Sequence, residues 1–424
     1  MNLRRLFPIL LIIFTNILGA GTIIPILPLY AEGQFAGTVP QITLLTASFF
    51  GAQFLAAPWL GNLSDRYGRR PILILSQLGT VSAFILFIFA RPLGSAIDSL
   101  GASLPLSGGM LMLFIARIVD GITGGNITTA QAYVSDITSE EDRAQGLGYL
   151  QAAFGAGFIF GPAFGGVLST YGPVIPFIGA AMITTVTFLL TTFTLKESLP
   201  PLERGETTER SRTLPSLSLL IGQPALTTIL AIVFVSSLAF SALPATFALY
   251  ATHVLFAEAT DPGRIQLYVG LMLTFSGSVT VLTQIAFLRP LVKRLGERVT
   301  LLVGEISLMI SFLGIGLVAG PILATAFMAP YAFGQGISQP NLQSITTRLG
   351  TKRTKGQLLG YYQSSRSLAL IIGPVWAGYA FDAISPQAVY LIGGGAMVVA
   401  VFLAVRLLRQ PVRAASDSAD GAPA

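Results

Sequence analysis

The feature that most constrains this chain is a series of unbroken apolar stretches, each about twenty residues long. A helix of that length rises about 30 Å, which is the thickness of the hydrocarbon core of a bilayer. Strands of an outer-membrane barrel would instead appear as alternating segments of about ten residues, so the pattern excludes a barrel. We therefore expect membrane-spanning helices over residues 6–30, 42–60, 71–90, 109–133, 144–169, 173–195, 225–251, 265–288, 299–319, 321–347, 356–381 and 386–408.

The composition points to the same class of protein. Of the 424 residues, 53% are hydrophobic and 10% are charged, which leaves too little polar surface to cover a water-soluble globule. The chain has no Cys and one His, which excludes disulfides and paired-histidine zinc motifs, and we expect no metal and no cofactor. The net charge of +6 fits basic loops beside anionic lipid, and we expect no nucleic-acid partner.

A charged, proline-bearing stretch from Lys196 to Pro224 separates the first six apolar stretches from the last six. Such a stretch cannot lie in lipid and is typical of a flexible linker. The sequence predicts an all-α membrane protein of twelve transmembrane helices in two pseudo-symmetric six-helix bundles, over 1–195 and 225–409. Residues 410–424 are small and polar, and we expect a disordered cytoplasmic tail.

The placement of positive charge tests this arrangement of spans. Most of the 25 Lys and Arg residues fall in every second connection, in the linker and at the two termini, and few fall in the other connections. Lys and Arg collect on the cytoplasmic side of a membrane, so an even number of spans with both termini cytoplasmic accounts for the pattern. We expect a multi-pass protein of the cell's inner membrane.

An internal repeat indicates that the two halves are similar. Residues 145–166 align without gaps with 357–378, and the coinciding positions include Tyr149 with Tyr361 and Gly161 with Gly373. Tyr and Gln positions match as well as Gly and Pro, so abundance of small residues does not explain the alignment. Repeats of this kind are typical of transporters whose site lies between two halves that rock against each other.

A very short turn between the second and third spans carries one acid and three arginines, in the order Gly61-Asn-Leu-Ser-Asp65-Arg66-Tyr-Gly68-Arg69-Arg70. This turn resembles the signature loop of the major facilitator superfamily. Ordinary positive-inside charge explains the arginines but not their order with glycine and aspartate. The resemblance implies that Asp65 helps to latch the halves in one state, with Asp136 and Arg143 as its partners. The implied conformational latch comprises Gly61, Asp65, Arg66, Gly68, Arg69, Arg70, Asp136 and Arg143.

Two further patterns resemble the same superfamily. In the fourth span, Arg117 and Gly121 fit its Arg-x-x-x-Gly pattern, and the fifth span resembles the motif of exporters that run as antiporters. Small residues at helical spacing form a close-packing face and Gly-Pro introduces a kink, so glycine-rich packing with no bearing on direction is the alternative. The antiporter motif comprises Gly155, Gly157, Gly161, Pro162, Gly165 and Gly166.

The whole chain is similar to the drug/proton antiporter branch, and within it to tetracycline-type exporters in NILGAGTIIPILP and RIVDGITGGN. The resemblance implies proton-coupled efflux of a small lipophilic or drug-like compound by alternating access, and we expect a monomer. Uptake or exchange of a polar metabolite, such as a sugar or an organic anion, is the alternative. Asn16 stands where tetracycline-type exporters have an acid, so neither their substrate nor their proton path carries over intact. We find no P-loop, paired-histidine motif or nucleophile elbow, and we expect no enzyme activity.

Asp120 is the acid that we expect to couple protons. It lies about eleven residues into the fourth span, which at about 1.5 Å per residue is close to the bilayer centre. Opening to either side would change its hydration and so its protonation. A plain structural ion pair with Arg117 is the alternative. We expect one continuous polar stripe of Arg117, Asp120, Gly124, Thr128 and Gln131.

We expect a substrate cavity near the midplane, lined mainly by the first, fourth, seventh and tenth spans as the resemblance implies. Arg366 lies close to the centre of the eleventh span and should meet a substrate anion or Asp120. Glu305 should pair with a basic turn residue such as Arg294 or Arg348, and His253 should lie at the membrane interface. The candidate substrate-binding residues are Asn16, Ile23, Phe240, Phe247, Tyr331, Gln335, Gln339 and Arg366.

Overall fold

A computed structural model describes residues 3–100, 105–124, 126–199, 223–258, 261–350 and 354–410 of the chain. Within these ranges all regular structure is helical. Most of the predicted linker and the predicted tail lie outside the described residues.

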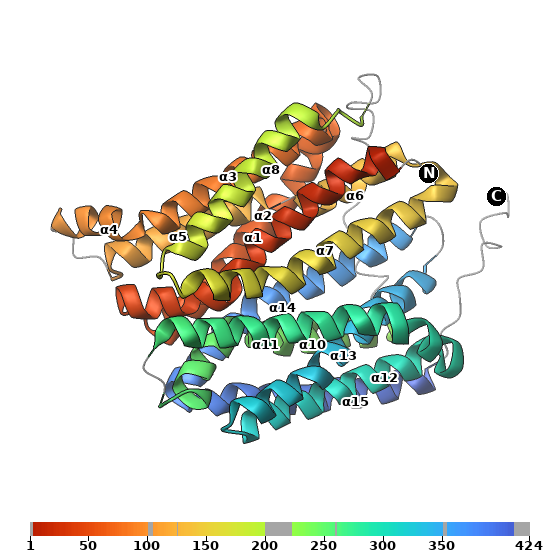
Figure 1. Cartoon of the computed structure of the whole chain (residues 1–424). Coiled ribbons are helices and arrows are strands. Elements are labelled where there is room, and N and C mark those ends of the chain that lie inside the picture. The colour runs from red at the N-terminus through yellow and green to blue at the C-terminus, as the bar shows by residue number, and fades with distance from the viewer. Residues whose placement is uncertain are drawn as a thin grey trace. The chain divides into compact units, whose positions relative to one another are not determined.

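The part before the linker contains eight helices in the described ranges, drawn from red to yellow-green in Figure 1. Seven of them lie within or extend the six predicted spans, and α4 is a short helix that the sequence did not predict. They are α1 (Leu3–Phe35), α2 (Val39–Tyr67), α3 (Arg69–Ile88), α4 (Ala90–Ser99), α5 (Gly108–Thr123), α6 (Asn126–Ile137), α7 (Glu140–Ser169) and α8 (Ile175–Thr194).

The part after the linker is built in the same way, with two helices that end in a wider π-helical turn. These helices are α10 (Pro224–Tyr250) with η3 (Ala251–Leu255), α11 (Pro262–Leu282) with η4 (Thr283–Phe287), α12 (Leu288–Leu317), α13 (Pro321–Arg348), α14 (Lys355–Ala383) and α15 (Pro386–Arg409).

Nine segments of the described chain are long and apolar enough to cross a membrane. One of them, Pro262–Leu317, has 56 residues and holds two crossings, because Gly296 interrupts it with a positive φ of 79°. α13 and α14 have 28 and 29 residues, long enough to cross, but Gln, Ser, Gly and Pro lower their hydropathy. With these additions the described helices give the twelve crossings that the sequence predicts.

The helices group into two compact units. The first comprises Met1–Arg212 and Pro244–Thr274, and the second comprises Thr213–Leu243 and Phe275–Ala424. The start of α11 belongs to the first unit because it packs closely on α7: a Cβ added to Gly270 would lie 2.4 Å from the carbonyl oxygen of Pro162. Thr274 also donates a hydrogen bond to the carbonyl oxygen of Ile159 at 3.0 Å.

The internal repeat corresponds to equivalent packing in the two units. A Cβ added to Gly161 of α7 would lie 2.7 Å from the carbonyl oxygen of Leu18 in α1. At the matching position of α14, a Cβ added to Gly373 would lie 2.8 Å from the carbonyl oxygen of Leu238 in α10. The first helix of each half therefore meets the same glycine of the repeat, which supports the prediction of two similar halves.

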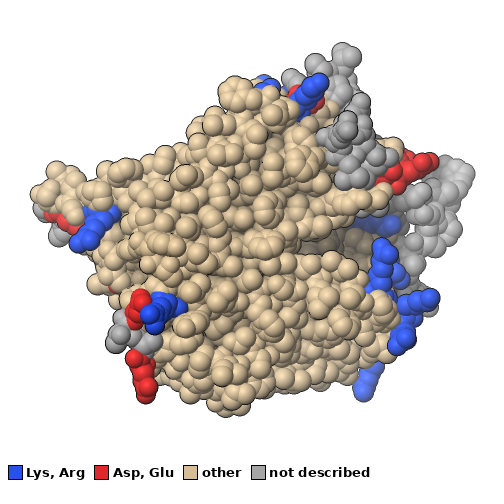
Figure 2. Space-filling view, viewed as in Figure 1, with Lys and Arg blue, Asp and Glu red and all other residues tan. Residues whose placement is uncertain are grey.

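Each unit has its own buried apolar cluster. In the first unit it is formed around α1 by residues such as Ile9, Ile13 and Val134, and in the second by residues such as Ile229 and Leu301. Large apolar side chains also lie on the outer surface, and Figure 2 shows charged residues gathered at the helix ends with an uncharged stretch between them. Lipid rather than water is the solvent that this surface suits, so close packing holds the helices together.

Candidate functional site

The centre of the first unit holds a buried acid with two partners. Asp120 of α5 is 8% exposed, and one of its carboxylate oxygens lies 3.4 Å from Nη1 of Arg117. Its other oxygen accepts a hydrogen bond from the hydroxyl of Thr80 in α3 at 2.9 Å. The predicted Arg117–Asp120 pair therefore forms, and Thr80 is a third member that the sequence did not indicate.

The Arg-x-x-x-Gly pattern has a local physical reason in this structure. The guanidinium of Arg117 lies over the ring of Phe49 in α2, 4.2 Å from the ring centroid. One turn further along α5, a Cβ added to Gly121 would lie 2.5 Å from the carbonyl oxygen of the same Phe49. The glycine lets α2 approach α5 closely enough for its aromatic ring to contact the arginine.

The polar stripe that we predicted on one continuous helix is divided between two. α5 ends at Thr123, and Gly124 has a non-helical ψ of 21° before α6 begins. The side-chain amide of Gln53 donates a hydrogen bond to the carbonyl oxygen of Gly124 at 3.0 Å, which satisfies a group that the break leaves free. The prediction of an unbroken helix here was wrong, because glycine has a low helix propensity and a neighbouring helix supplies the missing bond.

The predicted latch loop is a tight turn at Gly68, whose φ is 106°. The side chain of Arg69 pairs with Asp65 one turn earlier and with Asp136 of α6 at 3.2 Å. Asp65 and Asp136 thus meet through a shared arginine rather than directly. Arg143 is exposed at the start of α7, outside this group.

An acid at the start of the linker completes the loop. The carboxylate of Glu197 accepts hydrogen bonds from the backbone N–H groups of Arg69 and Arg70 at 2.8 and 3.2 Å. These are orphan donors at the N-terminus of α3, so Glu197 caps that helix from 128 residues away. The sequence did not indicate this capping role, although Glu197 is the first acid after the sixth span.

The antiporter motif of α7 forms a close-packing face, as predicted. Cβ atoms added to Gly157 and Gly161 would lie 2.7 Å from the carbonyl oxygens of Phe14 and Leu18 in α1. One turn further, a Cβ added to Gly165 would lie 2.9 Å from the carbonyl oxygen of Thr22. No residue larger than glycine fits these positions without moving α1.

The neighbouring side of α7 packs against α11. A Cβ added to Gly166 would lie 3.0 Å from the carbonyl oxygen of Gln266 and 3.1 Å from Cα of Leu267. The hydroxyl of Ser169 lies 3.5 Å from the carbonyl oxygen of Gly263. The motif therefore places α7 between α1 and the start of α11.

The candidate substrate residues of the second unit form one aromatic pair and one polar pair. The ring of Phe240 stacks on Tyr331 with centroids 5.9 Å apart. The amide oxygen of Gln339, in the orientation that satisfies both its atoms, accepts bonds from Nη2 and Nε of Arg366 at 2.9 and 3.3 Å. Gln335 lies half-buried one turn before Gln339 on α13. The sequence proposed both Gln339 and Arg366 but not that they bind each other.

The remaining candidates lie in the first unit. Ile23 and Phe247 are buried, with exposed fractions of 5% and 1%. Asn16 is also buried, and its side-chain Nδ2 has no hydrogen-bond partner among the described residues. A buried amide nitrogen without a partner is unusual and marks a position where water or a ligand would be stabilised.

Comparisons with known proteins decide the family. The model of the major facilitator superfamily matches residues 9–374, and a second match covers 266–423. This chain belongs to the major facilitator superfamily. The membership confirms the predicted all-α membrane fold. It also confirms that the chain is a multi-pass membrane protein that transports small molecules and is not an enzyme.

Three relatives in the superfamily match almost the whole chain. The class D tetracycline resistance protein of Salmonella ordonez is 30% identical, covering 94% of this chain and 96% of the relative. The class G tetracycline resistance protein of Vibrio anguillarum is 32% identical, covering 86% of this chain and 87% of the relative. Multidrug resistance protein 2 of Bacillus subtilis (strain 168) is 30% identical, covering 94% of each.

Solved structures of the superfamily share the fold. The human organic anion transporter MFSD10 superposes with a TM-score of 0.65 at 22% identity, covering 95% of this chain and 99% of that chain. A mutant of the nucleoside transporter NupG superposes with a TM-score of 0.74 at 12% identity, covering 95% and 100%.

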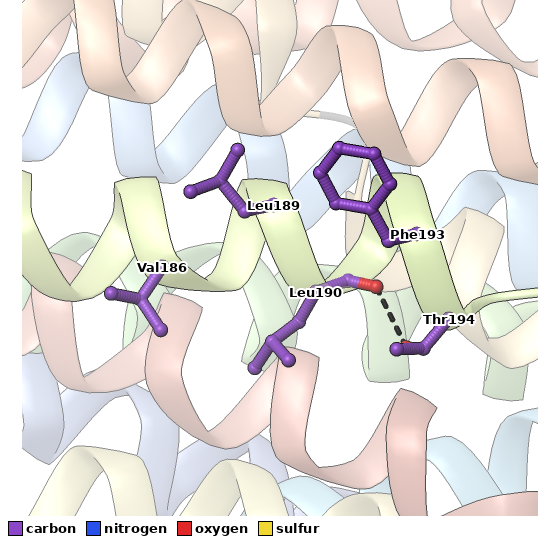
Figure 3. Close-up of a pocket in the computed structure, with 5 residues that line it drawn as sticks. All are labelled: Val186, Leu189, Leu190, Phe193 and Thr194. Atoms are coloured by element: carbon purple, nitrogen blue, oxygen red, sulfur yellow. Dashed lines mark hydrogen bonds between the residues drawn. The ribbon is translucent and has the colours of Figure 1, made fainter.

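One surface hollow of this superfamily member runs along a single helix. It lies on α8 and is lined by Val186, Leu189, Leu190, Phe193 and Thr194 (Figure 3). The hydroxyl of Thr194 is bonded to the carbonyl oxygen of Leu190 at 2.7 Å, and the ring of Phe193 is 81% exposed. All five residues come from one helix, as is typical of a furrow that faces lipid.

We predict that Glu197→Ala loosens the signature loop of this superfamily member. Loss of an N-terminal cap costs about 1 kcal/mol, and two backbone donors would lose their acceptor. Thermal unfolding in detergent should shift downward, and amide hydrogen exchange should quicken in the first turn of α3. Glu258→Ala, at an exposed acid, is the control. Equal exchange at Arg69 and Arg70 in both variants would contradict the capping role.

Proposed function

We propose that this chain is a secondary active transporter that exports small lipophilic, drug-like molecules in exchange for protons. Its relatives over most of their length are named for resistance to tetracycline and to multiple drugs, which supports this substrate class. The close-packed glycine face of α7 lies in the motif that is typical of antiporters. The single observation that carries proton coupling is the buried carboxyl of Asp120.

Asp120 suits this role because its surroundings can stabilise either protonation state. Arg117 at 3.4 Å and the hydroxyl of Thr80 at 2.9 Å stabilise the carboxylate, whereas burial favours the neutral acid. A change in hydration during alternating access would shift the balance between these effects. We propose that Asp120 binds a proton from outside and releases it to the cytoplasm, while Arg117 stays charged throughout and loses its ion-pair partner when the acid is neutral.

We further propose that the transporter lies in the inner membrane as a monomer with both termini in the cytoplasm. The basic turn that contains Arg69 and Arg70 fits the cytoplasmic side. Asp65, Arg69 and Asp136 would form the latch that stabilises one state of the cycle, with Glu197 holding the loop in place.

The proposed substrate site includes two pairs of the second unit: Arg366 with Gln339, and Tyr331 with Phe240. A stacked aromatic pair and a guanidinium held by an amide are groups that suit a planar molecule with a polar edge. Asn16, Ile23, Phe247 and Gln335 are proposed as further lining residues.

We predict that Arg366→Lys weakens substrate binding by about tenfold while transport at saturation falls less. Lysine keeps the positive charge but loses the planar fork that donates two bonds to Gln339. Initial rates of transport over a range of tetracycline concentrations would give KM and the maximal rate. Arg406→Lys, at an exposed residue in the last turn of α15, is the control. An unchanged KM would argue against a bidentate role.

The test of the proposed function is transport into proteoliposomes. Vesicles with an acidic interior should accumulate tetracycline or the cationic dye ethidium, and nigericin, which collapses the pH gradient, should stop the accumulation. Vesicles without protein give the background. Uptake of an organic anion or a sugar with no flux of either drug would instead support exchange of a polar metabolite.

A further inference from the structure

The second unit contains a buried acid to which the proposed cycle assigns no role. Glu305 of α12 is 0% exposed. It lies nine residues beyond the break at Gly296, or about 13 Å along the helix axis, so it is well inside the membrane-spanning part of α12. The prediction that it pairs with a basic turn residue was wrong, because Arg348 pairs instead with Glu297 at 2.8 Å.

The contacts of Glu305 are neutral. Its Oε2 accepts a hydrogen bond from the hydroxyl of Ser236 in α10 at 2.6 Å. Its Oε1 has no hydrogen-bond partner among the described residues. The hydroxyl of Ser338 in α13 is a second neutral group beside this carboxyl, and it lies against Gly304, the residue next to Glu305.

No described Lys, Arg or His is within ion-pair distance of Glu305. The part of α10 in this unit and η4 contain no titratable residue. On α13, Arg348 is occupied by Glu297, and Tyr331 packs on Phe312, about two turns from Glu305.

The remaining charged residues near Glu305 belong to α12 itself and to α15, and they lie at one end of α12. Arg298 donates to the carbonyl oxygens of Leu407 and Gln410 at 3.3 and 2.8 Å, which places the last turn of α15, with Arg406 and Arg409, at that end. The other titratable residue of α15, Tyr390, packs on Phe312. The other charged residues of α12 are Arg289, Lys293, Arg294 and Glu297, which precede or adjoin the break at Gly296.

A carboxylate that is cut off from both water and cations is strongly unfavourable, so Glu305 requires a proton in this arrangement. A permanently neutral anchor between α10 and α12 would need only an amide or a hydroxyl at this position. An acid has a further capability: it can release its proton when the surrounding helices open to water.

We propose that Glu305 is a second proton-binding site of this transporter, separate from Asp120. A carboxylate oxygen takes a proton from water on one side of the membrane and returns it to water on the other, and no other bond forms or breaks. Ser236 holds the side chain in place through its hydrogen bond to Oε2. The inference rests on the proposed proton-coupled transport.

Infrared difference spectra of the purified protein, recorded between mildly acidic and mildly alkaline pH, test this directly. The C=O stretch of a protonated carboxyl group should disappear as the pH rises. One such component should be missing in Glu305→Gln and present in Asp120→Asn. A wild-type spectrum with no component that depends on Glu305 would overturn the proposal.

Transport provides the second measurement. Glu305→Gln keeps the hydrogen bond to Ser236, so a purely structural role predicts normal accumulation of tetracycline. The proposal instead predicts that accumulation driven by a pH gradient falls by about tenfold or more while exchange without a gradient continues. Accumulation equal to that of the wild type would overturn it.

A second variant, Ser236→Ala, and a titration without substrate complete the experiment. If Glu305→Gln does not fold, Ser236→Ala should shift the pH midpoint of the same carboxyl component, and an unmoved spectrum would count against the assignment. Infrared titration needs no substrate, so its result concerns Glu305 alone. Absence of drug flux in the wild type, with a titrating Glu305, would overturn the proposed drug export instead.

Discussion

Asp120→Asn should abolish accumulation of drug against a gradient in acid-inside proteoliposomes, with a loss of about 100-fold or more. Asparagine has almost the same shape and can still accept the hydrogen bond from Thr80, but it cannot bind and release a proton. Exchange of substrate at equal pH on both sides should continue. The measurement is the rate of tetracycline uptake in the two conditions, at matched amounts of protein.

The control for this variant is Asp261→Asn, which neutralises an exposed acid paired with Arg264. Unchanged pH-driven accumulation in Asp120→Asn would remove Asp120 from the mechanism. If the variant instead fails to fold, the Arg117–Asp120 pair is structural, because removal of one partner leaves a buried charge. Arg117→Gln combined with Asp120→Asn would then restore folding.

Gly161→Ala should destabilise the protein strongly and reduce its transport. The new methyl group would lie 2.7 Å from the carbonyl oxygen of Leu18 and 2.8 Å from Cα of Gly21, and backbone atoms cannot rotate away. Overpacking of this kind costs about 1–3 kcal/mol, so the amount of folded protein and its melting temperature in detergent should both fall. Fluorescence-detected size-exclusion chromatography after heating measures the change.

Gly148→Ala is the matched control, because it lies on the same helix and a Cβ there would meet nothing within 4 Å. It should be neutral or slightly stabilising, since alanine is the better helix former. If both variants melted at the same temperature, the close contact between α7 and α1 would not contribute to stability.

The sequence predicted those features that depend on local patterns. Apolar length gave the crossings, and the spacing of Gly157, Gly161 and Gly165 gave the packing face of α7. It did not predict features that depend on distant partners, such as the cap that Glu197 places on α3 or the pairing of Gln339 with Arg366. Nothing in the local sequence distinguishes a capping acid from any other acid in a charged linker.

The break after Thr123 was missed for the same reason. A glycine inside an apolar stretch does not reveal whether the helix continues. Here the break is stabilised by Gln53 on another helix, whose side-chain amide donates a hydrogen bond to the carbonyl oxygen of Gly124. Glu305 is a second case: its position near the basic turns of the ninth span predicted a charged partner, but the structure gives it the hydroxyl of Ser236.

The contact of Glu197 with the signature loop limits how the gene can be divided. Split-protein experiments express the two halves of a protein from separate plasmids, and the linker between the halves is where the chain would be cut. Here a cut before Glu197 would separate the start of α3 from its capping carboxylate, along with Ser198, whose hydroxyl bonds to Asp136 at 2.9 Å. A first fragment that ends after Leu199 keeps both contacts, so reporter domains and cleavage sites belong beyond that residue.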